Sequence, residues 1–224
     1  MSSINDISIG RFAKLIVFDM DSTLIDAETI DELARAAGVA EKVADITERA
    51  MNGELDYGEA LIERVKLLKG LKLEDAIDAV DKMPLMTGAR ELIEYVKSKG
   101  FTTAMISGGF TLSADLVGET LGIDHVYSNF LTIEDGYLTG GVTGPLTKQD
   151  AKEEVFQKIA DMHGVKPDQC IVVGDGANDI CIFKKARYAI AFNSKPILQQ
   201  YANVVIAKKD LRAIIPVIES LNLE

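Results

Sequence analysis

Short hydrophobic segments recur along the chain, and their composition is typical of buried strands. They are LIVF at 15–18, TTAMI at 102–106, CIVV at 170–173, YAIAF at 188–192 and VVI at 204–206. Consecutive apolar positions are characteristic of strands that are covered on both faces of a sheet. Segments with helical periodicity separate most of them, as in a parallel sheet with crossover helices. The pattern therefore predicts an α/β protein with a central parallel sheet.

One segment has a different pattern. NFLTIEDGYLTGGV, at 129–142, alternates between hydrophobic and polar residues around Asp135-Gly136. A strand with one face exposed alternates in this way, and Asp-Gly favours the two-residue turn of a hairpin. We therefore predict a β-hairpin here.

The chain between the first and second hydrophobic segments is far longer than one crossover helix needs. Segments with helical periodicity occupy 28–37, 40–51, 57–69 and 73–82. Four short helices in a row cannot all pack on the sheet as one crossover. We therefore predict that 27–83 is a small helical cap domain inserted after the first strand, and that 1–26 and 84–224 form the α/β core. A helix over 87–100, with Thr87 as its N-cap and Gly100 just beyond its end, returns the chain to the core.

Composition narrows the classes of partner. The 224 residues include 24 Lys and Arg against 35 Asp and Glu, a net charge of −11. Nucleic acids and anionic membranes select basic surfaces, so we expect neither as a partner. No apolar run approaches the length of a membrane span, and MSSINDISIGRF lacks the apolar segment of a signal peptide. We expect a soluble, cytoplasmic protein.

Polar residues with chemical potential follow three of the predicted strands. Asp19 and Asp21 follow the first, Ser107–Gly109 follow the second, and GDGAND at 174–179 follows the third. Ligands of doubly wound sheets bind outside the C-terminal ends of the strands. We therefore expect these groups to meet at one edge of the sheet.

The acidic residues of this edge predict a metal ion. Two carboxylates about 4 Å apart repel by about 4 kcal/mol at an effective dielectric constant near 20. Mg²⁺ offsets such repulsion, because it prefers oxygen ligands and binds carboxylates together with phosphate and water. Ser107–Gly109 offers a hydroxyl, close backbone N–H groups and a following helix, which suit phosphate. Lys152, at the start of a helix predicted to run to about 163, is placed to reach the same phosphate.

An aspartate beside Mg²⁺ and phosphate can be a nucleophile that forms an aspartyl-phosphate. Asp21 is then placed to protonate the leaving alcohol and later to deprotonate water. In strand-like geometry the side chains at i and i+2 share a face, so that Asp19 and Asp21 can both address one phosphorus atom.

The chain resembles the haloacid dehalogenase-type phosphatases. DMDST at 19–23, ISGG at 106–109, Lys152 and GDGANDI at 174–180 match the four motifs of that family in order and spacing. The resemblance runs from about Lys14 to the C-terminus, and is greatest to the branch that acts on phosphorylated serine. It implies a Rossmann-like core with a cap, and Mg²⁺-dependent hydrolysis of O-phospho-L-serine to L-serine and phosphate, the last step of serine biosynthesis.

The resemblance also implies a role for each motif residue. Asp19 corresponds to the nucleophile and a metal ligand, and Asp21 to the general acid/base, whose backbone carbonyl also binds the metal. The residues that correspond to the phosphoryl-binding groups are Ser107, Gly108, Lys152 and Asn178. Asp175 and Asp179 correspond to further metal ligands. In the cap, Glu28 corresponds to the residue that faces the substrate ammonium and Arg64 to the one that pairs with its carboxylate. Tyr57 and Met51 are expected to line the lid.

Other functions remain open at this point. The same chemistry fits a phosphotransferase, or a phosphatase for phosphohomoserine or phosphothreonine, which present the same two charges to Glu28 and Arg64. A non-catalytic binding module that keeps the fold is an alternative of another class. We expect a small phosphorylated amino acid as the partner, and a monomer or a homodimer as the assembly.

Overall fold

The computed structural model describes residues 14–52, 54–148 and 150–221. The prediction that 1–13 begin the core lies outside these residues. The strands are β1 (Leu15–Phe18), β2 (Thr102–Phe110), β3 (His125–Glu134), β4 (Tyr137–Thr143), β5 (Ile171–Gly174), β6 (Tyr188–Phe192) and β7 (Val204–Ile206). The α-helices are α1 (Thr29–Ala36), α2 (Ala40–Met51), α3 (Tyr57–Lys66), α4 (Leu73–Asp81), α5 (Ala89–Ser98), α6 (Thr111–Leu121), α7 (Ala151–Met162), α8 (Ile180–Lys185), α9 (Pro196–Gln199) and α10 (Ile215–Ser220).

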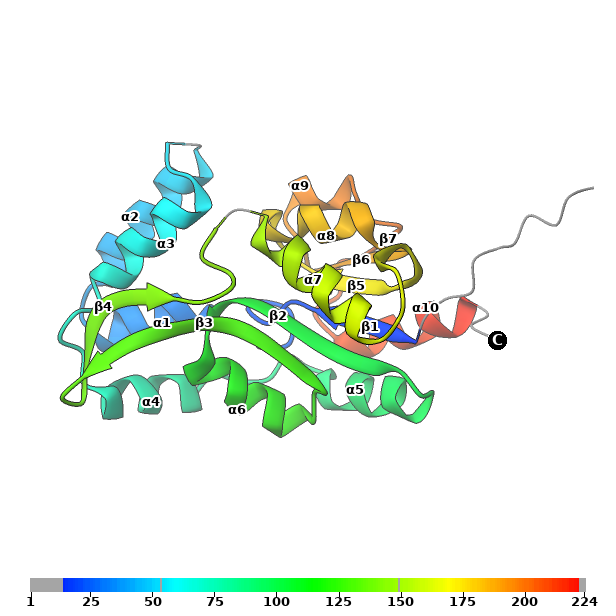
Figure 1. The fold of residues 1–224 in the computed structure, drawn as a ribbon, viewed down its shortest axis with the longest axis horizontal. Coiled ribbons are helices and arrows are strands. Elements are labelled where there is room, and N and C mark those ends of the chain that lie inside the picture. Colours follow the sequence, from blue (N-terminus) through cyan, green and yellow to red (C-terminus); the bar gives the residue numbers. More distant parts are fainter. Residues whose placement is uncertain (1–13, 53, 149, 222–224) are drawn as a thin grey trace, which may run out of the picture.

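All seven strands of the described residues belong to one sheet, in the order β4-β3-β2-β1-β5-β6-β7 (Figure 1). Only β3 and β4 are antiparallel to each other. The central strand β1 pairs in parallel with β2 and β5, and its last residue, Phe18, lies opposite Met105 and Val173. The C-terminal ends of these three strands therefore meet at one edge. The predicted α/β fold with a central parallel sheet is confirmed.

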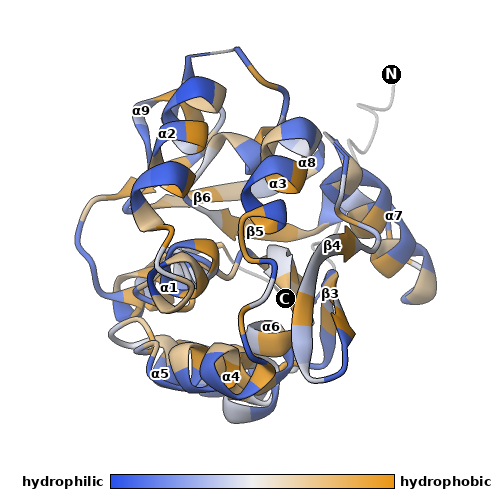
Figure 2. Ribbon diagram, turned by 90° about the vertical axis from the view of Figure 1, so that its left-hand side faces the viewer, coloured by the Kyte–Doolittle hydropathy of each residue, from blue (hydrophilic) through white to orange (hydrophobic). Residues whose placement is uncertain are grey.

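The sheet is covered on both faces, because alternate residues of its strands point to opposite sides. In β1, Ile16 and Phe18 belong to one buried cluster, which includes residues of α5, α6 and α10. Leu15 and Val17 belong to another, which includes residues of α7, α8 and α9. Figure 2 shows hydrophobic residues along β5 between helices that carry both hydrophobic and hydrophilic residues. The continuous apolar composition of the strands follows from this two-sided burial.

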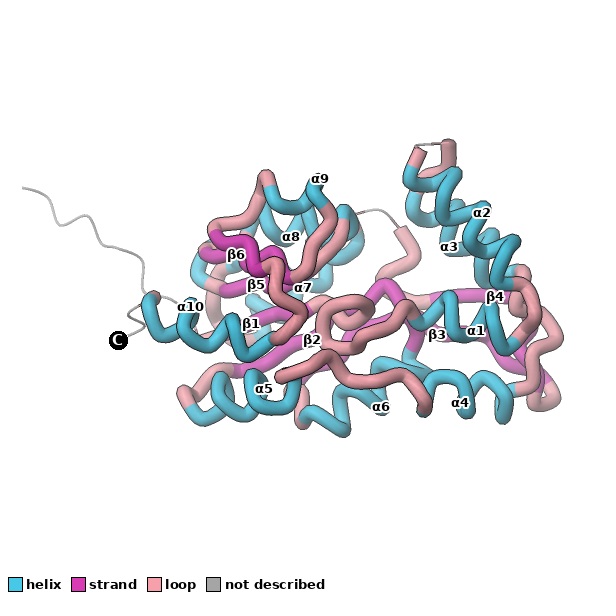
Figure 3. The backbone as a smooth tube through the Cα atoms, turned by 180° about the vertical axis from the view of Figure 1, so that it is seen from behind, coloured by secondary structure: helices cyan, strands magenta, loops and turns pink. Residues whose placement is uncertain are grey.

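The helices α1 to α4 gather at one end of the molecule, and α10 lies at the other (Figures 1 and 3). Residues from all four helices share a buried cluster that is distinct from the two clusters of the sheet. A capping box begins α3, where Asp56 accepts the N–H of Glu59 and Glu59 accepts the N–H of Asp56. Phe110 of β2 and Leu138 of β4 join the same cluster. The helical insert after the first strand is therefore as expected, and it packs on the hairpin as well.

The hairpin lies where it was predicted. Its strands are β3 and β4, and the turn residues Asp135 and Gly136 have φ angles of 50° and 79°. Positive φ at both central positions is the geometry that Asp-Gly favours. None of the helices in the described residues combines the length and the apolar character that crossing a membrane requires.

Two predicted boundaries are wrong. The second strand does not end at residue 106 but continues to Phe110, because β3 runs alongside it and pairs Phe110 with Asn129 after a register shift. The helix α5 starts at Ala89 and its N-cap is Gly88, with φ of 79°, and not Thr87. The carbonyl of Thr87 instead accepts the N–H of Leu211 at 2.8 Å.

Candidate active site

The loop after β1 holds the two aspartates of DMDST. The N–H of Asp19 donates to the carbonyl of Val173 at 2.9 Å, so that Asp19 extends the pairing with β5 and is 3% exposed. The side chain of Met20 is buried in the core, and its carbonyl accepts the N–H groups of three following residues, 23 to 25. The chain therefore turns at Met20 and brings Asp21 to the end of the strand.

Lys152 connects two of the site's carboxylates. It is the second residue of α7 and is 5% exposed. Its Nζ lies 2.6 Å from Oδ1 of Asp19 and 2.7 Å from Oδ1 of Asp179. Burial alone would lower the pKa of Lys152, but the two carboxylates outweigh that effect and hold the pKa above its usual range. The lysine is therefore charged and fixed at the end of the central strand.

Three buried carboxylates lie together here, and two of them bond to Lys152. One oxygen from each of Asp19, Asp175 and Asp179 lies within 4.8 Å of the other two. Asp179 Oδ2 also accepts the N–H of Asp175 at 3.2 Å. Burial first, and then the charge of Asp19, raises the pKa of Asp175 to about 8 and that of Asp179 to about 6.

This donor set suits a divalent cation. Three buried carboxyl groups lie together, and the ammonium group of Lys152 bonds to two of them, which leaves an excess of negative charge when all three are ionised. A cation among the carboxylates would offset that excess, and Mg²⁺ prefers oxygen donors of this kind. The residues present therefore fit the predicted metal ion.

The segment Ser107–Gly109 faces the aspartates from the end of β2. The hydroxyl of Ser107 lies 3.3 Å from Oδ2 of Asp21 and accepts the N–H of Gly109 at 3.0 Å. Asn129, buried in β3, donates to the carbonyl of Gly108 at 3.1 Å and accepts the N–H of Leu146 at 2.9 Å. Sequence analysis missed Asn129, although an amide within a strand segment is a visible signal of a buried hydrogen-bond partner.

Asp21 lies between the core and the first helix of the cap. Burial, then the charge of Glu28, raises the pKa of Asp21 to about 7. Thr29 donates to Asp21 Oδ1 through its N–H at 2.7 Å and its hydroxyl at 2.6 Å. Glu28 accepts the hydroxyl of Ser22 at 2.7 Å, and burial raises its pKa as well. Sequence analysis missed Ser22 and Thr29, since neither residue type is diagnostic alone.

Two of the predicted cap residues are on α3, at the side of the carboxylate site. Tyr57, the first residue of α3, packs its hydroxyl against Gly108. Arg64, on the same helix, donates to the carbonyl of Ala60 at 3.1 Å, and burial lowers its pKa. The charges of Arg64 and Lys152 both act on the pKa of Tyr57, which burial raises overall. These two cap residues therefore lie near the carboxylate site.

Two predicted residues lie at the margin. Met51, at the end of α2, is 72% exposed and is outside the apolar clusters of the described residues. Asn178 is exposed in the turn between β5 and α8, with Oδ1 close to Gly176. Their expected roles in the lid and in phosphoryl binding stay predictions.

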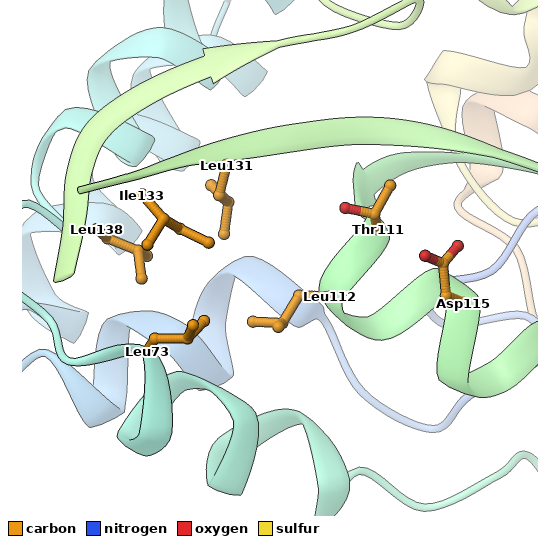
Figure 4. A pocket seen from close by; sticks show the side chains of 7 residues that line it. All are labelled: Leu73, Thr111, Leu112, Asp115, Leu131, Ile133 and Leu138. Carbon is orange, nitrogen blue, oxygen red and sulfur yellow. The ribbon is translucent and has the colours of Figure 1, made fainter. Parts of the chain in front are cut away.

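A separate cavity lies between the cap and the hairpin. Its volume is about 340 Å³, and its apolar lining comes from Leu73 of α4, Leu112 of α6, Leu131 and Ile133 of β3, and Leu138 of β4 (Figure 4). None of the predicted site residues is among its described lining residues. This cavity is therefore distinct from the carboxylate site.

Residues 13–187 match the sequence model of the haloacid dehalogenase-like hydrolases. The match includes the central strand, the cap and every residue of the carboxylate site. The chain thus belongs to this class of hydrolases.

More specific similarities lie within that class. A phosphoserine phosphatase of Methanocaldococcus jannaschii is 46% identical over 92% of this chain and 98% of its own length. A phosphoserine phosphatase of Wolinella succinogenes is 45% identical over 90% of this chain and 98% of its own length.

Two solved structures are 45% identical to this chain. An analogue of the phospho-aspartyl intermediate of phosphoserine phosphatase has a TM-score of 0.87 and covers 92% of this chain and 99% of its own. A substrate-bound phosphoserine phosphatase has a TM-score of 0.88 and covers 93% of this chain and 99% of its own. The family is that of the phosphoserine phosphatases, and this chain is a member of it.

Proposed function

We propose that this chain hydrolyses O-phospho-L-serine to L-serine and inorganic phosphate, the step that completes serine biosynthesis. The observation that carries the proposal is the buried group of Asp19, Lys152, Asp175 and Asp179 at the end of the central strand, with Asp21 beside it. Such a group offers a nucleophile, an acid and a cation-binding site around one position, as phosphoryl transfer through an aspartyl-phosphate requires.

The chemistry takes two steps. In the first, a carboxylate oxygen of Asp19 bonds to phosphorus, the bond from phosphorus to the serine oxygen breaks, and Asp21 gives that oxygen its proton. In the second, Asp21 takes a proton from water, the water oxygen bonds to phosphorus, and the bond to Asp19 breaks. Asp21 is protonated again at the end, which returns the site to its starting state.

The phosphoryl group needs cationic and hydrogen-bonding partners during both steps. Lys152 offers a charge that is already fixed, and Ser107 and the N–H of Gly108 offer donors. Asp19, Asp175, Asp179 and the carbonyl of Asp21 would hold Mg²⁺. The ion would neutralise charge on the phosphoryl oxygens and reduce the repulsion between phosphate and carboxylates.

Recognition of the amino acid is the task of the cap. Glu28, the N-cap of α1, and Arg64, on α3, offer a carboxylate for the substrate ammonium and a guanidinium for its carboxylate. Both are half-buried, and the charge of Glu28 acts on the pKa of Arg64. These two groups would bind the two opposite charges of one zwitterion.

Phosphate release tests the proposal. We expect Mg²⁺-dependent release from O-phospho-L-serine to exceed that from phosphothreonine, phosphohomoserine and an aryl phosphate. Phosphate release from the aryl phosphate alone would support the phosphatase mechanism but would contradict phosphoserine as the substrate. Adding alcohol acceptors separates hydrolysis from phosphotransfer, and absence of turnover on every substrate would favour a binding module.

Substitution of Arg64 tests the specificity directly. Arg64→Ala should lower kcat/KM for phosphoserine by about thirtyfold or more, because truncating one partner of a desolvated charge pair costs about 2–5 kcal/mol. The aryl phosphate, which has no carboxylate, should change by less than about threefold. Lys66→Ala, an exposed position on the same helix, is the matched control. Equal losses on both substrates would mean that Arg64 is structural or binds phosphate.

The remaining expectations concern the protein as a whole. A phosphorylated amino acid as the partner, without nucleic acid or membrane, and a monomer or homodimer stay predictions, as does cytoplasmic localisation.

A further inference from the structure

The two oxygen atoms of the Asp21 carboxyl group have different surroundings. Oδ1 accepts two short hydrogen bonds, both from Thr29. Oδ2 faces the phosphate-binding segment, 3.3 Å from the hydroxyl of Ser107. A Cβ on Gly109 would lie 2.9 Å from Oδ2, so the bare α-carbon of Gly109 leaves this oxygen its space. Only Oδ2 is therefore directed to the place where the phosphoryl group binds.

Thr29 is itself buried, beside a serine of α6. Its side chain is 1% exposed, and its hydroxyl lies 3.3 Å from that of Ser113 on α6. The hydroxyl of Ser113 donates to the carbonyl of Phe110 at 3.0 Å. The first residue of α1 is Thr29, so its N–H is one of the N-terminal donors that have no partner within the helix. Asp21 supplies that partner.

We propose that Thr29 is a positioning residue that orients the general acid: its two donors occupy Oδ1 of Asp21 and leave Oδ2 to deliver the proton to the leaving oxygen. The inference rests on the proposed function. In the step concerned, the electron pair of the breaking bond from phosphorus to oxygen goes to the leaving oxygen, which takes the proton from Oδ2, while a carboxylate oxygen of Asp19 bonds to phosphorus. Thr29 touches none of the reacting atoms and acts only through Asp21.

The proposal predicts a dependence on the leaving group. An alkoxide is a poor leaving group and needs the proton as the bond breaks, whereas an aryl oxide leaves without it. Loss of orientation at Asp21 therefore slows alkyl phosphates and spares aryl phosphates. The ratio kcat/KM is the right quantity, because it includes only the steps up to release of the first product, and not the later attack of water.

The experiment compares Thr29→Val with Thr29→Ser on three substrates: phosphoserine, a simple alkyl phosphate such as ethyl phosphate, and p-nitrophenyl phosphate. Valine keeps the shape and removes the hydroxyl donor, while serine keeps the donor. We expect Thr29→Val to lower kcat/KM about tenfold or more for both alkyl phosphates, since small misplacements of a reacting group cost up to about a hundredfold. The kcat/KM for the aryl phosphate should change by less than about threefold. Thr29→Ser should retain most of the activity on the two alkyl phosphates.

Two other outcomes would overturn the proposal, each in a distinct way. Equal losses on all three substrates would give Thr29 a structural role. A loss on phosphoserine but not on ethyl phosphate would mean that Thr29 acts on substrate recognition through its neighbour Glu28. If Thr29→Val does not fold, as judged by circular dichroism, Thr29→Ala removes the same hydroxyl with less steric constraint. The comparison of ethyl with aryl phosphate holds even if phosphoserine is not the preferred substrate.

Discussion

At the scale of single residues, the site depends on an imbalance of charge. Lys152 bonds to Asp19 and to Asp179, and the charge of Lys195 only partly opposes the rise in the pKa of Asp175. A buried ion pair of this kind contributes little net stability, because desolvation offsets most of the attraction. The arrangement instead fixes the orientation of Asp19, whose other oxygen stays available for phosphorus.

Replacing the nucleophile should separate activity from stability. We expect Asp19→Asn to lower kcat by at least about a thousandfold, because it removes the carboxylate proposed to bond to phosphorus. The variant should fold, since it removes one of three neighbouring negative charges. Phosphate release and circular dichroism measure the two properties. Asp45→Asn, an exposed change on α2, is the control, and retention of more than a few per cent of activity would contradict the assignment of the nucleophile.

At the scale of elements, the cap touches the core at a glycine. A Cβ on Gly108 of β2 would overlap the hydroxyl of Tyr57 at the start of α3, closer than real contacts allow. The next atom of the ring, Cζ, would be 3.4 Å away, which is an ordinary contact. Gly108 is not among the residues with positive φ, so its backbone accepts alanine. The hydroxyl of Tyr57 alone is therefore what excludes a side chain there.

A double-mutant cycle tests this contact. Gly108→Ala should destabilise the protein by about 1–3 kcal/mol through overpacking. Tyr57→Phe removes the overlapping atom, so the double variant should recover at least about 1 kcal/mol of the unfolding free energy relative to the sum of the single changes. Urea denaturation measures the unfolding free energy of the two single variants and the double variant. Simple additivity would mean that Tyr57 moves aside in solution and that α3 does not sit against β2 as described.

The same scale shows what the sequence can and cannot predict. The strands and the motif residues were predictable, because each depends on a local pattern: four apolar positions before Asp19, or Asp-Gly at the hairpin turn. The roles of Thr29 and Asn129 were not, because their partners are fixed only in the fold: the amide of Asn129 signals a buried hydrogen bond but not its partners, and the contact of Thr29 with Ser113 joins segments that are distant in sequence. The extension of β2 to Phe110 also depends on a partner, β3, and not on the residues of the extension.

At the scale of the whole molecule, Mg²⁺ binding should raise the thermal stability of the folded protein. A ligand at 100 times its Kd stabilises the folded state by about 2.7 kcal/mol. For a chain of this size each kcal/mol raises Tm by about 2–4 °C, so Mg²⁺ should raise Tm by roughly 5–10 °C. Asp175→Asn should abolish that increase and, above about pH 8, where the Asp175 carboxyl is ionised, should raise Tm in the presence of a chelator, because one buried like charge is gone. An equal Mg²⁺ shift in the variant would place the ion elsewhere.

Chelation gives the corresponding test of activity. EDTA should reduce phosphate release from phosphoserine to background, and excess Mg²⁺ should restore it, since the carboxylates would otherwise repel the substrate phosphate. Turnover that persists in EDTA would contradict the metal site at Asp19 and Asp175.

The position of β1 in the sheet also has a consequence for how the protein is made. Ile16 pairs with Ile171, 155 residues further along the chain. At a synthesis rate of about 5–20 residues per second, β1 waits roughly 8–30 s for this neighbour. Loop closure over such a separation is slow, and the strand edge is exposed to other chains in the meantime. The helical insert, whose helices are contiguous in sequence, can collapse first. The carboxylates of the candidate active site are thus among the last groups of the nascent chain to acquire their surroundings.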